Sequence, residues 1–165
     1  MRELLRRAED RLAAAEGALL VLLLAVMVIL AFAQVVLRHF GMGLLWGETV
    51  LKHLVLWTGF LGAALAARSE KHFAWEASHV AAPARAKPWL RLAANLCGAA
   101  VTAVLLKAAW SYLADERASG AELMTIGSTV VPAWIASAGI PGGFALVLVH
   151  LLFKSADAAA EAAGR

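Results

Sequence analysis

Polar, charged and aromatic residues gather between Gln34 and His72, where one hydrophobic stretch ends and a second one follows. A membrane span carries such residues at its ends or opposite a partner. The set comprises Gln34, Arg38, Trp46, Glu48, Lys52, Trp57, Gly59, Gly62, Arg68 and His72. Their chemistry is ion pairing, hydrogen bonding between helices and close helix packing. They are therefore our candidates for a subunit interface or a structural hairpin.

Glu48 and Lys52 are four residues apart, so on a helix they can form an ion pair. Two interpretations stay open: an interfacial pair at the outer membrane edge, or part of an inter-subunit or coupling network. Glu48 stands only two residues into its span, so a proton relay is not required to explain it. Arg38 lies close in sequence across a short turn, and we predict an Arg38–Glu48 pair that clamps the hairpin.

The second hydrophobic stretch has two unlike faces when it is treated as a helix. One face carries the charged pair and small residues: Glu48, Lys52, Gly59, Ala63 and Ala66. The opposite face is bulky: Trp46, His53, Trp57 and Phe60. Small residues let another backbone come close. The pattern predicts tight helix packing on the small face, and lipid or a broad partner surface on the aromatic face.

Enzyme and cofactor chemistry find little support in the residues. A bis-histidine haem needs two ligands at one depth, whereas His53 and His150 are expected near opposite membrane surfaces. Cys97 is the only cysteine, which excludes a disulfide or a cysteine metal site within one chain. The chain has no Ser-His-Asp set, phosphate loop or carboxylate cluster. We expect no enzyme, no cofactor and no metal.

The composition shows that long hydrophobic segments must position these residues. Of the 165 residues 62% are hydrophobic, more than the roughly half that is usual in soluble domains. Four hydrophobic stretches, each near the roughly 20 residues that a helix needs to cross a bilayer, cover about 17–37, 46–67, 90–113 and 132–153. Little chain remains between them. We predict an all-α membrane protein with four transmembrane helices in a single membrane domain, 1–165.

The distribution of charge predicts the topology. Most Lys and Arg residues lie before the first stretch, between the second and third, and after the fourth. The positive-inside rule then places the N and C termini in the cytoplasm. Residues 1–16 and 70–88 are expected to form short interfacial helices. In the fourth stretch Pro141, with Gly139, Gly142 and Gly143, predicts a kink or a close helix contact.

The block from Gln34 to His72 also resembles the small membrane subunit of tripartite ATP-independent periplasmic (TRAP) transporters, the DctQ-type small permease. That family has an Asn or Gln and then an Arg near the end of the first span, a Trp and a Glu opening the second, a Trp and Phe-x-Gly within it, and a basic residue and a His after it. Here these are Gln34, Arg38, Trp46, Glu48, Trp57, Phe60, Gly62, Arg68 and His72. Thr49 replaces a second acidic residue that is common in the family, and residues 73–76 depart from its usual apolar run.

The resemblance implies a scaffold subunit in the bacterial inner membrane. A large TRAP membrane subunit would carry the substrate and sodium sites, and a periplasmic binding protein would deliver an organic acid such as a dicarboxylate or a sialic-acid-like carboxylate. Membrane lipids would be further partners, and no nucleic acid is expected. One alternative is a self-contained small four-helix transporter; small multidrug exporters of that size carry a membrane-embedded Glu in the first helix, whereas the first span here has no acid after Glu16. A membrane cytochrome anchor is the other.

Overall fold

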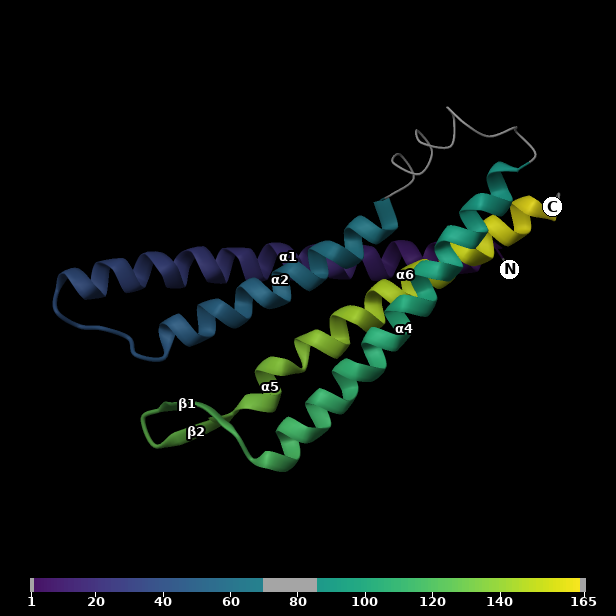
Figure 1. The fold of residues 1–165 in the computed structure, drawn as a ribbon. Coiled ribbons are helices and arrows are strands. Elements are labelled where there is room, and N and C mark those ends of the chain that lie inside the picture. Colours follow the sequence, from purple (N-terminus) through teal and green to yellow (C-terminus); the bar gives the residue numbers. More distant parts are fainter. Residues whose placement is uncertain (1, 70–85, 164–165) are drawn as a thin grey trace.

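The computed structural model describes residues 2–69 and 86–163. Four long helices dominate it: α1 (Arg2–His39), α2 (Gly47–Ser69), α4 (Lys87–Ser119) and α6 (Gly139–Ala162) (Figure 1). Between α4 and α6 lie two short strands and one short helix: β1 (Glu122–Ile126), β2 (Thr129–Pro132) and α5 (Ala133–Ser137).

The prediction of four transmembrane helices is confirmed. In the part of the chain that the structure describes, four helical segments are long and apolar enough to cross a membrane: Glu9–His39, Gly47–Arg68, Lys87–Ser119 and Ala133–Ala162. Each exceeds or matches the roughly 20 residues required. The protein is therefore a multi-pass, predominantly helical membrane protein, with one small β-hairpin added to the predicted all-α class.

The first helix is continuous from Arg2 to His39. A boundary between a surface helix at 1–16 and a span at 17–37 does not appear as a break in it, and the interfacial location of residues 1–16 stays a prediction. Of the second expected interfacial segment, 70–88, residues 70–85 lie outside the described residues, as does His72. Pro88 stands in the first turn of α4, where proline is favourable because its missing N–H would have no partner in the helix.

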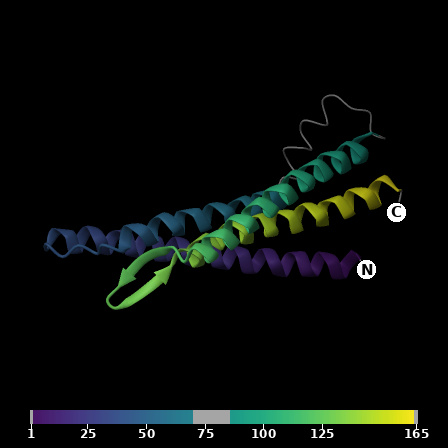
Figure 2. The same cartoon turned by 60° about the horizontal axis from the view of Figure 1, so that its bottom comes forward.

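The helices pack in the spatial order α1, α2, α6, α4. The start of α1 and the end of α6 lie at the same end of the bundle (Figures 1 and 2). An even number of spans requires this arrangement. The side of the membrane on which both ends lie stays a prediction from the charge distribution. We call this end of the bundle the terminal end and the opposite one the loop end.

The loop end carries a β-hairpin between α4 and α5. The third helix continues to Ser119, and Gly120 follows it in the left-handed conformation at φ 64° that commonly ends helices. Strands β1 and β2 then pair antiparallel, with Ile126 opposite Thr129. The two-residue turn between them begins with Gly127 at φ 63°, a conformation that Gly adopts without strain.

Candidate subunit interface

The aromatic side of α2 packs tightly inside the chain, against α6. A Cβ atom added at Gly139 would lie 2.4 Å from Trp57 Cδ1, and one added at Gly143 would lie 2.4 Å from Phe60 Cβ. These two glycines therefore give α2 its closest approach to α6. The predicted close helix contact around Pro141 is confirmed. The prediction that the aromatic face meets lipid or a broad partner is wrong for Trp57 and Phe60.

The fourth span is interrupted between α5 and α6, and Trp57 of α2 donates a hydrogen bond to the last turn before the break. Helix α5 ends at Ser137 and α6 begins at Gly139. Pro141 has no N–H group to donate back into the preceding turn. The Trp57 indole Nε1–H donates a hydrogen bond of 2.7 Å to the Ala136 carbonyl oxygen. The predicted kink thus takes the form of a break at Ala138, three residues before the proline.

The opposite side of α2 faces outward. Glu48 and Lys52 form the predicted ion pair at 2.9 Å, and their side chains are 74% and 71% exposed. Gly59 and Ala63 are exposed too, and a Cβ added at Gly59 would meet no atom within 4 Å. Within residues 2–69 and 86–163, Gly59 and Ala63 therefore do not form the predicted tight packing, which stays a prediction for contact with another protein. We call Glu48, Lys52, Gly59 and Ala63 the outward face of α2.

The α1–α2 hairpin closes differently from our prediction. Glu48 pairs with Lys52, and across the described residues Arg38 forms no ion pair with Glu48, so the predicted clamp is wrong. The Gln34 side chain instead lies over buried Gly47, where an added Cβ would be 2.7 Å from Gln34 Nε2. Close packing of one side chain on one glycine therefore joins the two helices at the loop end.

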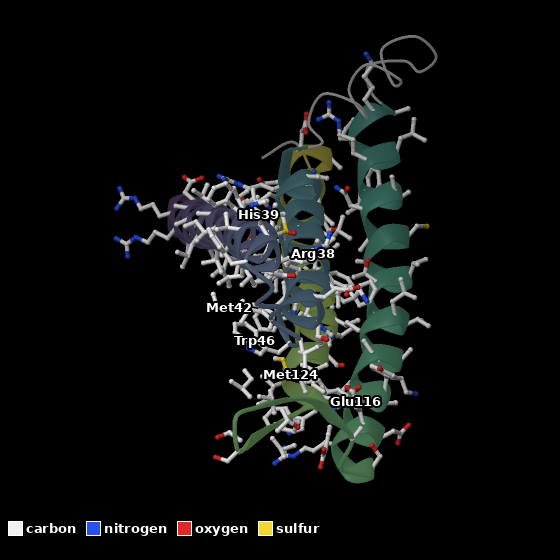
Figure 3. All side chains as sticks on the ribbon, turned by 90° about the vertical axis from the view of Figure 1, so that its left-hand side faces the viewer. Arg38, His39, Met42, Trp46, Glu116 and Met124 are labelled. Atoms are coloured by element: carbon white, nitrogen blue, oxygen red, sulfur yellow. The ribbon has the colours of Figure 1, made fainter. Side chains whose placement is uncertain are left out.

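Two further candidates are Trp46, at the turn between α1 and α2, and Gly62, within α2. Trp46 offers its carbonyl oxygen to the Val50 N–H at 3.1 Å, which helps to open α2. Figure 3 looks onto the loop end, where Arg38 and Trp46 flank the turn between α1 and α2. A Cβ atom added at Gly62 would have nothing within 4 Å, so no close approach among residues 2–69 and 86–163 explains this glycine.

Arg68 belongs to a cluster of ionisable groups at the terminal end. Its guanidinium pairs with Asp10, and its Nε lies 3.8 Å from Glu9 Oε1. These contacts join α2 to the first turns of α1. The predicted place of Arg68 at the inner edge of its span is consistent with a structural role there.

Sequence reasoning missed the buried partner of this cluster. His150 is completely buried, and its Nε2 lies 3.0 Å from Glu16 Oε2 and 3.2 Å from Glu16 Oε1. Glu16 itself is only 4% exposed. The positions of the two residues along the membrane normal could have indicated this pair. Glu16 immediately precedes the first span and His150 stands near the end of the fourth, so the topology places both near one membrane surface.

The described residues, 2–69 and 86–163, contain no group of three or more His, Cys, Asp or Glu side chains that could hold a metal ion. Polar groups in these residues instead pair across helices, as in Glu16–His150 and Arg68–Asp10. Their arrangement suits holding helices together.

Comparison with known proteins identifies the chain. The family model described as "Tripartite ATP-independent periplasmic transporters, DctQ component" matches residues 27–160. No curated protein matches the chain. The matched region runs from the second half of α1 nearly to the end of α6 and includes the outward face of α2, the glycine contacts and His150. The chain therefore belongs to the DctQ family, the small permease component of TRAP transporters.

Proposed function

We propose that this chain is the scaffold subunit of a sodium-driven, binding-protein-dependent TRAP importer of organic acids in the bacterial inner membrane. It braces the large permease subunit and contributes no substrate or sodium site of its own. The observation that carries the proposal is the outward face of α2 in a chain of this family. The substrate class and the sodium gradient rest on the family resemblance.

The outward face is suited to a protein neighbour. Exposed small residues at Gly59 and Ala63 permit close approach of another helix, which is how helices associate within a bilayer. Glu48 and Lys52 give the same face a polar end to which a partner can add hydrogen bonds. Since Trp57 and Phe60 already hold α2 to α6, a partner can bind the outward face without disturbing that contact. The occupant we propose is the large TRAP membrane subunit.

The β-hairpin is the proposed contact for the periplasmic binding protein. The positive-inside rule places the loop end on the periplasmic side. Two apolar side chains, Ile126 and Val130, are 41% and 45% exposed on the hairpin. Exposed apolar groups at the edge of a small sheet favour contact with another protein.

Co-purification with the large subunit tests the bracing role. Ala63→Leu adds bulk to the outward face, and we expect the yield of complex to fall about tenfold, which corresponds to about 1.4 kcal/mol. Ala100→Leu makes the same change at an exposed residue of α4 and should leave the yield unchanged. Both variants should melt as the wild type does when purified alone. Equal yields from the two variants would rule out the outward face as the interface.

A further inference from the structure

Helices α4 and α6 run side by side (Figures 1 and 2), and a groove of about 660 Å³ opens between them toward the loop end. Nearer the terminal end the two helices touch, since a Cβ atom added at Gly98 would lie 3.5 Å from Leu151 Cδ1. Ala103, Pro141 and Gly142 line the groove, and a Cβ atom added at Gly142 would meet no atom within 4 Å. Small side chains on both helices, next to the break in the fourth span, therefore leave a space that the scaffold role does not use.

The polar groups of the groove lie at its end nearer the loop end. Lys107 and Ser111 of α4 line it there, beside the ring of Trp110, and no acidic residue lines it. Among residues 2–69 and 86–163, the Lys107 ammonium and the Ser111 hydroxyl have no hydrogen-bond or ion-pair partner. The hydroxyls of Thr102 and Ser155, by contrast, each donate to a carbonyl oxygen four residues earlier, at 2.8 Å. An ammonium and a hydroxyl one helical turn apart are thus left to donate to an anion such as a phosphate.

The depth of this cation in the membrane favours a lipid as its partner. Trp110 and Tyr112 are exposed on α4, and such side chains gather at the level of the lipid headgroups. Lys107 stands three residues deeper than Trp110, about 4.5 Å along the helix, where an ammonium needs a partner or access to the headgroups. Deeper still, the groove is lined by apolar residues such as Ala103. Polar and apolar surface therefore follow one another along the membrane normal in the order of a phospholipid.

We propose that the groove between α4 and α6 binds one anionic phospholipid from the leaflet at the loop end. Lys107 and Ser111 donate hydrogen bonds to its phosphate, and one acyl chain lies along Ala103 and Gly142. The net negative charge of the lipid complements the single cation of the groove, whereas a zwitterionic headgroup brings an ammonium of its own. In the row α1, α2, α6, α4 the groove lies between the last two helices, so the lipid and a partner on the outward face of α2 occupy different surfaces.

Native mass spectrometry of the full chain, released from detergent with added lipid, tests the headgroup. The probe is phosphatidylglycerol, and phosphatidylcholine with the same acyl chains is its zwitterionic counterpart. We expect one bound phosphatidylglycerol with a Kd roughly fivefold below that of phosphatidylcholine. Lys107→Gln should remove this preference, and Lys107→Arg, which keeps the charge, should preserve it. Lys52→Gln is the matched control, because Lys52 already pairs with Glu48, and it should leave the preference unchanged.

Filling the apolar part of the groove tests the acyl chain. Ala103→Phe should weaken the binding of both lipids several-fold. Ala108→Phe makes the same change at another exposed residue of α4 that does not line the groove, and it should leave both Kd values unchanged. Glycerophosphoglycerol, the headgroup without acyl chains, should not displace the lipid even in large excess. Displacement by it would mean that the groove binds a free phosphate ester, which contradicts a lipid site.

Photo-cross-linking in the complex with the large subunit identifies what fills the groove in a chain that keeps Lys107 and Ser111. The variant is Ala103→p-benzoylphenylalanine, at an exposed residue. We expect the cross-linked product to be phospholipid. A cross-link to the large subunit in its place would overturn the proposal, and so would equal Kd values for the two lipids in the wild-type chain.

Discussion

At the scale of single residues, Gly139 and Gly143 decide how close α2 comes to α6. Each leaves room that a Cβ atom would fill, against Trp57 and Phe60 respectively. The sequence marks this segment by its proline and glycines, and the close contact was predictable from them. Its partner was not, because helical periodicity within one span does not tell which neighbour lies beside it.

Gly143→Ala tests this contact. The added methyl group would lie 2.4 Å from Phe60 Cβ, so α2 and α6 must separate, and we expect a loss of about 1–3 kcal/mol, as for other overpacked sites. Thermal unfolding of the purified protein measures it. Gly142→Ala, at a neighbouring residue with nothing within 4 Å, should change stability by less than about 0.5 kcal/mol. Equal effects at the two glycines would contradict the close approach.

Trp57→Phe separates the hydrogen bond from the packing. The ring is largely kept, while the Nε1–H donor to the Ala136 carbonyl oxygen is lost. We expect destabilisation of about 1 kcal/mol, the usual net value of such a bond. Trp110, which is 66% exposed, offers a matched Trp→Phe control. If its replacement costs as much in the same melting assay, the Trp57 bond contributes nothing specific.

The Arg38–Glu48 prediction was wrong for a local reason. Glu48 has Lys52 one turn along its own helix, and this pair forms without ordering a loop. The contact of Gln34 with Gly47 depends on the geometry of the turn, which the sequence does not specify. The Glu16–His150 pair joins residues 134 positions apart, a separation at which no local pattern in one sequence signals contact.

At the scale of elements, the two faces of α2 differ as predicted, but the aromatic face packs on α6 and not on the predicted lipid or broad partner surface. The aromatic side meets glycines of α6, whereas the small side is outward. A close contact between two helices can form with the small residues on either helix, so the small residues of α2 did not show which of its sides would meet α6. The β-hairpin was missed because its strands are short, five and four residues. The Gly127–Ser128 turn and the β-branched residues on both sides of it are its local signals.

Glu48→Gln tests whether another protein covers the outward face of α2. The Glu48–Lys52 pair is exposed on the isolated chain, so breaking it should leave the stability of that chain nearly unchanged. If the large subunit covers this face, the same change should weaken co-purification several-fold. Melting of the chain alone and yield of the complex are the two measurements. A large loss of stability in the isolated chain would contradict an exposed pair.

At the scale of the whole molecule, hydrophobicity and length were sufficient to predict four spans, because a bilayer imposes both on any helix that crosses it. Charge predicts the orientation. Single cysteines at Ala156 and Ser128, in a Cys97→Ser background, test it with a membrane-impermeant thiol reagent applied to intact cells. Ser128→Cys should react and Ala156→Cys should not. The reverse labelling would invert the topology.

The whole molecule is a bundle whose shape is fixed by contacts inside the chain, at Gly139, Gly143 and His150, while α2 turns its small, charge-paired side outward. Most of the apolar surface of α1 is exposed as well. These exposed surfaces suit the proposed contacts with lipid and with a larger membrane subunit.

Reconstituted transport is the most direct test of the central claim. Proteoliposomes would contain the large TRAP subunit with or without this chain, together with the binding protein loaded with its organic acid and an imposed sodium gradient. We predict uptake only when both membrane subunits are present, and no uptake with this chain alone. Undiminished uptake without this chain, or uptake by this chain alone, would contradict the account.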